Sequence, residues 1–185
     1  MFKLLNGEVP APKSARPPHN ARGGAVAILK VKGDNSKSVI CMGLDAVYKE
    51  ITDFGGGVKS TERFFDAAQR EFREETLKVF KKYPTSKSVY YHDNMIIIFY
   101  VYIFNTEEEM MKYIKDVSDE FERNKAGLKK VEVEKLVWIP LETFADMVSE
   151  GEMDRKIFYE KYNYIFYDRV FLFFKNMGID LIASL

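Results

Sequence analysis

A run of glycines, followed at fixed spacing by a highly charged stretch, constrains this chain more than any other feature. Residues 55–57 are all glycine, Glu62 follows after five intervening residues from Gly56, and the pair Arg70-Glu71 comes after seven more. Glu71, Glu74 and Glu75 then stand at i, i+3 and i+4, so a helix places three carboxylates on one face. Like charges at this spacing repel, and a hard divalent cation with oxygen ligands would offset them. The spacing therefore predicts a loop, a helix and a Mg²⁺ site.

This segment resembles the Nudix box, in which a glycine-rich loop leads into a helix with an Arg-Glu-x-x-Glu-Glu core. The matching residues are Gly56, Glu62, Arg70, Glu71, the apolar Phe72, Glu74 and Glu75. The chain departs from the family pattern at Leu77, where the family has glycine, at Lys78, where it has an apolar residue, and at Phe54, where proline is frequent. Matches at this many fixed offsets are far more specific than a lone glycine motif.

The resemblance implies an α/β/α sandwich with a mixed sheet. Residues 1–22 hold four of the six prolines and several cations, and we expect them to be an irregular basic lead-in to a single domain over residues 23–185. Expected strands cover 24–31, 38–44, 47–54, 89–91, 95–104 and 131–139. Helices are expected after a cap at Ser60 or Thr61, over 107–123, over 140–148, and over 157–177 as an extra aromatic-rich C-terminal helix.

Aromatic residues make up 15% of the chain, and many fall in that last predicted helix. They either pack the helix onto the sheet or form a surface, which stacks on a base or contacts a partner, including a homodimer. Elsewhere Tyr90, Tyr91 and Tyr102 are candidates for stacking on a base, with nothing in the sequence to choose among them.

Composition narrows the class of protein. Lys plus Arg equals Asp plus Glu, so the formal net charge is zero, which argues against non-specific nucleic-acid binding driven by overall charge. The single cysteine, Cys41, lies in an apolar run and is expected to be a buried thiol. The N-terminus lacks the apolar stretch of a signal peptide, and the longest apolar run, 95–104, is too short to cross a bilayer as a helix. A soluble cytoplasmic protein without a membrane partner is the expectation.

By the resemblance, Glu71, Glu74, Glu75 and the carbonyl of Gly55 would bind Mg²⁺, or Mn²⁺ in its place. Arg70 is predicted to support the site by pairing with Glu62 through its planar fork, the alternative being direct phosphate contact. Arg22 in the lead-in and Lys59 in the loop are predicted to contact the substrate.

The general base has several candidates. Glu132 stands six residues before Trp138 in a segment that resembles a late strand of the family, where a Glu often reaches the metal face. Glu134 competes, because the two-residue period of a strand sends both to one face. Both could equally be solvated strand residues, and His92 is a further acid or base candidate.

The resemblance implies a Mg²⁺-dependent hydrolase that cleaves a pyrophosphate bond in a nucleoside diphosphate linked to another group. Dinucleoside polyphosphates, diphosphoinositol polyphosphates and nucleotide sugars are the substrate classes in view. The alternatives are an mRNA-decapping enzyme, with capped RNA as its partner, and a non-catalytic domain that senses a ligand. Sensing domains usually lose box carboxylates, and here Glu71, Glu74 and Glu75 are all present.

Overall fold

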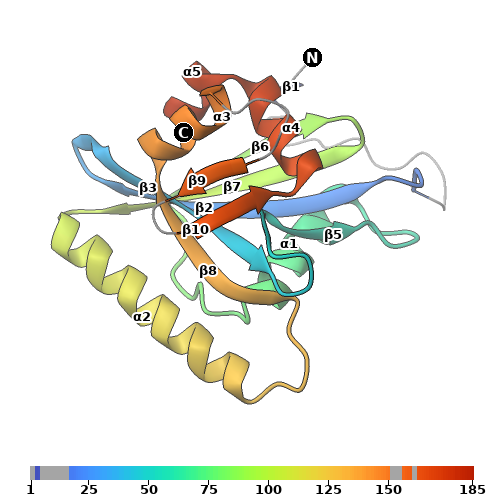
Figure 1. Ribbon diagram of the computed structural model, residues 1–185, viewed down its shortest axis with the longest axis horizontal. Helices are drawn as coiled ribbons and strands as arrows, with labels where there is room; N and C mark the ends of the chain where they lie inside the picture. Colours follow the sequence, from blue (N-terminus) through green and yellow to red (C-terminus); the bar gives the residue numbers. More distant parts are fainter. Residues whose placement is uncertain (1–2, 5–16, 151–155, 160–161) are drawn as a thin grey trace.

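The computed structural model describes residues 3–4, 17–150, 156–159 and 162–185. Its centre is a mixed sheet, which runs across the molecule in Figure 1. The strands are β1 (Lys3–Leu4), β2 (Arg22–Val31), β3 (Asp34–Asp45), β4 (Glu50–Thr52), β5 (Phe54–Gly57), β6 (Ser86–His92), β7 (Met95–Phe104), β8 (Val133–Pro140), β9 (Lys156–Tyr159) and β10 (Tyr162–Phe166).

Neighbouring strands follow the order β1-β6-β7-β2-β3-β4-β10-β9, with β5 also pairing β2 and β8 also pairing β3. The β2–β3 hairpin and the β6–β7 hairpin are antiparallel, whereas β2 and β7 run parallel over their whole length. A second parallel pair joins β10 to β4 with Phe166 opposite Ile51. The mixed sheet expected from the sequence is confirmed.

Helices cover both faces of this sheet. The five are α1 (Phe64–Glu75), α2 (Glu107–Ala126), α3 (Leu141–Glu150), α4 (Asp168–Met177) and α5 (Ile179–Ala183), counted over the described residues. In Figure 1, α3, α4 and α5 lie above the sheet and α2 lies below it. The α/β/α layering is thus confirmed.

Each face has its own apolar core, and β2 contributes to both because its side chains alternate. Val26 and Ile28 pack in the core under α3, α4 and α5. Ala25, Ala27 and Leu29 pack in the core under α1 and α2. Cys41 lies fully buried in this second core, as expected, and burial raises the pKa of its thiol.

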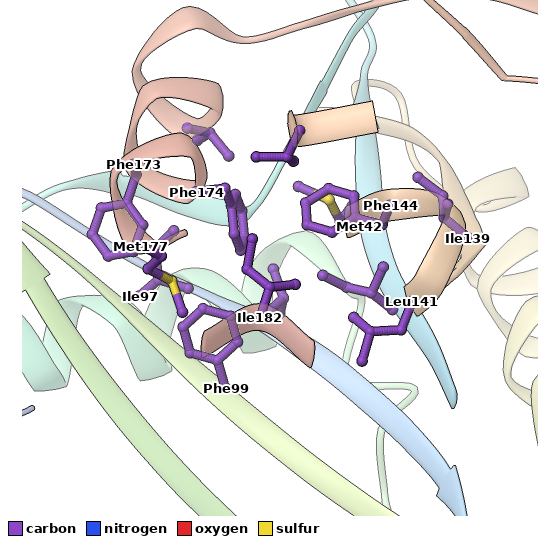
Figure 2. Packing of buried hydrophobic residues seen from close by; sticks show 14 of the residues in the cluster. Met42, Ile97, Phe99, Ile139, Leu141, Phe144, Phe173, Phe174, Met177 and Ile182 are labelled. Carbon is purple, nitrogen blue, oxygen red and sulfur yellow. The ribbon is translucent and has the colours of Figure 1, made fainter. Parts of the chain in front are cut away.

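The aromatic residues of the C-terminal region pack against the sheet. Phe174 of α4 lies between Phe173 of the same helix and Phe144 of α3 and above Phe99 of β7, and the rings of Phe144 and Phe174 are 4.8 Å apart at their centroids (Figure 2). Phe166 and Phe171 belong to the same core. The packing interpretation is confirmed for these residues, while the side chains of residues 150–164 lie outside the described part of the chain.

The predicted bounds were wrong in three places. The helix expected over 157–177 is instead β9, β10 and then α4, which begins only at Asp168. Helix α1 begins after Arg63, which makes no side-chain cap hydrogen bond, so neither Ser60 nor Thr61 is its cap. The strand expected over 47–54 is split into β4 and β5, and β5 contains the glycines themselves.

Most of the lead-in expected over 1–22 lies outside the described residues. Of the part that is described, Lys3–Leu4 forms β1 on the edge of β6, and Arg22 already begins β2. Within the described residues, the structure contains no helix with both the length and the apolar character needed to span a membrane.

Candidate metal centre and adjoining cavities

The glycine run brings the backbone of β5 against helix α1. Gly55 and Gly56 pair with Gly24 and Gly23 of β2. A Cβ atom added to Gly56 would lie 2.6 Å from Oε1 of Glu71, far inside van der Waals contact. Glycine is therefore required at this position for the carboxylate of Glu71 to lie against the strand.

Three carboxylates meet beside this strand. One oxygen from each of Glu71, Glu75 and Glu132 lies within 4.8 Å of the others. Glu71 is only 9% exposed. Two of the three, Glu71 and Glu75, come from successive turns of α1. The third, Glu132, lies just before β8, and its backbone carbonyl accepts the N–H of Ala46 at 2.8 Å. The group joins residues separated by more than fifty positions in the sequence.

Glu75 is the least compensated member of this group. Its Oε2 is buried and has no hydrogen-bond partner among the described residues. Burial raises the pKa of Glu75 to about 9, with Asp53 and Glu71 adding to the rise and Arg22 opposing it. A buried carboxylate oxygen without a partner is costly. The donor set consists of hard oxygens, which suits a divalent cation such as Mg²⁺, so these residues fit the metal.

Arg70 donates hydrogen bonds to three carboxylates, those of Glu62, Glu71 and Glu74. Its Nε and Nη2 donate to the two oxygens of Glu62 at 2.8 and 3.1 Å, which is the fork-to-fork geometry expected from the sequence. Its Nη1 donates to Glu71 at 2.5 Å and to Glu74 at 3.2 Å. Hydrogen bonding to Arg70 lowers the pKa of the Glu62 carboxyl. With its guanidinium engaged by three carboxylates, Arg70 is arranged to hold the site.

Glu74 and Gly55 occupy positions beside the group. The side chain of Glu74 is 56% exposed and bonds to Arg70, so it stands outside the cluster of Glu71, Glu75 and Glu132. The backbone of Gly55 hydrogen-bonds to Glu75, which places this glycine next to the site. Both stay candidate metal ligands.

An ion pair behind Glu75 escaped the sequence analysis. Nη2 of Arg22 lies 2.6 Å from Oδ1 of Asp53, and the Asp53 side chain is fully buried. Asp53 lies between β4 and β5, immediately before Phe54 and the glycines, in a segment that already contains polar residues and so gave no distinct signal. Arg22, predicted to contact the substrate, has its charge offset by Asp53 and lies at a cavity beside Glu75, so its contact with substrate stays a prediction.

Two cavities open on either side of Glu75. The larger, of about 440 Å³, is lined by Arg22, Asp45, Tyr48, Glu50, Thr52, Gly55, Glu75, Tyr167 and Asp168. The smaller, of about 200 Å³, is lined by Glu74, Glu75, Leu77, Leu128, Lys130, Val131, Glu132 and Val133. Glu75 lines both, so this member of the carboxylate group borders both cavities.

The other predicted site residues are dispersed. Lys59 is exposed, and its backbone N–H donates to Glu62 at 2.9 Å. Glu134 pairs with Lys49, and of the two competing residues Glu132 is the one that belongs to the carboxylate group. A shift in register beside Val133, where β8 pairs with β3, accompanies this separation. His92 ends β6 and lies near Asn176 of α4.

The tyrosines proposed for stacking do not line either cavity. Tyr90 and Tyr102 are 5% and 2% exposed and belong to the cores. Tyr91 donates to Asn94 and packs edge-on against Phe64. The tyrosines at the larger cavity are Tyr48, which no local pattern had marked, and Tyr167, which belongs to the aromatic-rich segment expected as the last helix.

Comparison with known proteins agrees with this geometry. The model of the NUDIX domain matches residues 22–162, which include β2, the glycine run, all of α1 and Glu132. No curated protein matches the chain significantly. Because the family model covers well over half of the chain, this protein belongs to the Nudix family.

Proposed function

We propose that this chain is a Mg²⁺-dependent hydrolase that cleaves a pyrophosphate bond in a nucleoside diphosphate linked to another group. The observation that carries the proposal is the gathering of Glu71, Glu75 and Glu132, with a buried unpartnered oxygen on Glu75. Carboxylates so arranged are costly unless a cation binds them. A bound Mg²⁺ would neutralise phosphate oxygens and lower the pKa of a bound water.

The residues of the chain have separate tasks in this proposal. Glu71 and Glu75 hold the cation, with Glu74 and the carbonyl of Gly55 as further candidate ligands. Arg70 holds Glu71 in position through a hydrogen bond, and its positive charge is paired with Glu62. Glu132, which is exposed, is the candidate to take a proton from the attacking water.

Lys130 is a further candidate for phosphate contact. It lines the smaller cavity together with Glu74, Glu75 and Glu132. A lysine ammonium at this place would pair with a phosphate oxygen as the bond breaks. The cation and Lys130 together would offset the charge of a diphosphate.

Purified protein should hydrolyse at least one member of a substrate panel only when Mg²⁺ or Mn²⁺ is added. The panel contains ADP-ribose, diadenosine polyphosphates, NADH, a nucleotide sugar, nucleoside triphosphates, diphosphoinositol phosphates and capped RNA. Glu71→Gln and Glu75→Gln remove charge while keeping shape, so turnover should fall on the order of 10²-fold or more. Turnover is measured by release of phosphate or nucleotide.

Glu132→Gln and Glu134→Gln form a matched pair in the same segment. Because only Glu132 belongs to the carboxylate group, its substitution should lower turnover strongly and Glu134→Gln should leave it within about twofold. Wild-type turnover in Glu75→Gln protein that remains folded would contradict the assignment of the metal centre. Equal losses in the Glu132 and Glu134 variants would remove Glu132 from its role.

A further inference from the structure

The buried ion pair of Arg22 and Asp53 has no task in the metal centre described so far. The Asp53 side chain is fully buried, and its Oδ1 accepts hydrogen bonds from Nη2 of Arg22 at 2.6 Å and from the hydroxyl of Thr52 at 3.1 Å. Neither partner belongs to the positions at which the chain matches the Nudix box, which begin at Gly56. Burying two charges costs about as much as their contact returns, so stability is a weak reason for such a pair.

The strands around Asp53 leave room for its carboxylate. Gly24 of β2 stands opposite Gly55 of β5. A Cβ atom added to Gly24 would overlap Oδ2 of Asp53, and one added to Gly55 would lie 2.9 Å from the same oxygen. Both strands therefore carry glycine where the carboxylate packs. The backbone of Gly55 in turn hydrogen-bonds to Glu75, so Asp53 lies against the strand that holds this candidate metal ligand.

Two carboxylates act on the charge of Arg22. One is its partner Asp53, and the other is Glu75, which lines the larger cavity together with Arg22. Nε of Arg22 is a buried donor and Oε2 of Glu75 is a buried acceptor, and neither has a hydrogen-bond partner among the described residues. A guanidinium pairs with carboxylates through several donors at once. Without the charge of Asp53, Arg22 would therefore be drawn to Glu75.

A guanidinium bonded to Glu75 would compete with a metal ion. It would occupy the oxygens that a hard cation needs, and its positive charge would repel that cation. We infer that Asp53 is a positioning residue of the metal centre, which holds Arg22 so that Glu75 stays available to the metal. The inference rests on the proposed function. Asp53 acts here through Arg22, since the carboxylate group found among the described residues consists of Glu71, Glu75 and Glu132.

Binding of Mg²⁺ to the full chain, measured by isothermal titration calorimetry, tests the inference without turnover. Asp53→Asn keeps the shape of the side chain and removes its charge. Affinity for Mg²⁺ should then fall by about tenfold or more, the usual effect of losing a group that supports a metal ligand. A crystal structure of this variant without metal should show Arg22 hydrogen-bonded to Glu75.

The double variant Arg22→Met with Asp53→Asn removes the competing cation as well. Because the net charge beside Glu75 is then the same as in the wild type, affinity for Mg²⁺ should return to within about threefold of the wild-type value. This variant also keeps the test open if Asp53→Asn alone does not fold, since replacing both partners of a buried pair is tolerated better than removing one.

Asp66→Asn is the matched control, because it also removes the acid of an Arg–Asp pair. Asp66 pairs with Arg63 at 2.7 Å and lines neither cavity beside Glu75, so its loss should leave Mg²⁺ affinity unchanged.

Three results would overturn the inference while the wild type still binds Mg²⁺. They are wild-type affinity in Asp53→Asn, an affinity in the double variant below the expected recovery, and an Arg22 that stays bonded to residue 53 in the crystal structure of Asp53→Asn. A wild-type protein that binds no Mg²⁺ would reject the metal centre of the proposed function, and the inference with it.

Discussion

Glu71 and Glu75 lie one turn apart on the same helix, yet their surroundings give them different electrostatic roles. Glu71 accepts a hydrogen bond from Arg70, so its negative charge is compensated within the protein. Glu75 faces the buried Asp53 and has an oxygen without a partner. Burial next to a like charge favours the neutral acid. In the metal-free protein the carboxyl of Glu75 therefore keeps its proton, whereas binding of a metal would need this carboxyl to be ionised.

The first residue-scale prediction concerns pH. The pKa of Glu75 rises from its ordinary 4.5 to about 9 on folding. Below pH 4.5 the carboxyl is protonated in both the folded and the unfolded protein, so it does not destabilise the fold. Between pH 4.5 and about 9 the unfolded chain has lost this proton while the folded protein still holds it. Stability of the metal-free protein should therefore fall as pH rises through this window, by at most about 1.4 kcal/mol per pH unit.

Glu75→Gln should abolish this part of the pH dependence, because glutamine does not titrate. With a chelator present, melting curves at pH 5 and pH 8 should show the variant gaining stability over the wild type at pH 8 only. Added Mg²⁺ should raise the melting temperature of the wild type more than that of the variant. A wild-type protein whose stability rises from pH 5 to pH 8 in the chelator would contradict the prediction.

The second residue-scale prediction separates support from substrate contact at Arg70. Arg70→Lys keeps the charge but loses the fork that holds both oxygens of Glu62. Glu62→Gln breaks the same pair from the other side. Each should lower stability by about 1–3 kcal/mol, the range for hydrogen bonds to charged groups, and should lower kcat by loosening Glu71. Denaturant unfolding and steady-state kinetics measure the two effects.

The double variant distinguishes the alternatives. If the pair is the main contact, Arg70→Lys with Glu62→Gln should lose little more than either single change. A raised KM with unchanged stability in Arg70→Lys, not reproduced by Glu62→Gln, is the signature of direct phosphate contact. Strictly additive losses would also reject the pair.

At the scale of elements, the chain departs from the family pattern in the turn that ends α1. Leu77 and Lys78 have φ values of 52° and 58°, in the left-handed region that favours glycine. The family glycine falls at residue 77, so the turn is kept although its usual residue is absent. The side chain of Leu77 packs against the second core, beside other apolar groups. The strain of a left-handed residue is offset there by burial.

Lys78→Gly should therefore stabilise the protein, because Lys78 is exposed and loses no packing. The gain should be about 0.5–1 kcal/mol, the relief of left-handed strain less the greater chain entropy of glycine. Leu77→Gly should gain less or lose stability, since it also removes a packed side chain. Lys78→Ala, which keeps the strain, serves as the control in thermal melts and should show no gain.

The elements also show where sequence reasoning succeeded. The glycine run, α1 and its carboxylates follow from local spacing, because a helix fixes the relation of residues three and four apart. The C-terminal prediction failed because aromatic residues suit strands as well as helices, and the parallel partner β4 decides for β10. The positions of Asp53, Tyr48 and Tyr167 beside Glu75 were missed for a different reason. They come together only through pairing of distant strands, which local patterns do not encode.

For the whole molecule, the terminal helices close one face of the sheet. Phe174 of α4 is fully buried between Phe99 and Phe144, whereas Leu172 on the same helix is 52% exposed. Phe174→Ala should destabilise the protein by about 3–5 kcal/mol through lost burial and a cavity, and Leu172→Ala by less than about 1 kcal/mol. Denaturant unfolding of both variants checks this. Similar stability in the two would show that α4 is not an essential layer of the fold.

The parallel pairing of β10 with β4 has a consequence for how such a protein can diversify. The clustered carboxylates of Glu71, Glu75 and Glu132 come from residues 71–132, while residues 167 and 168 also line the larger cavity. Mutations at residues 167 and 168 can reshape the cavity without substituting any member of the carboxylate group. A library randomised at Tyr167 and Asp168 alone is thus a direct route to altered selectivity, and its inactive members should still bind Mg²⁺.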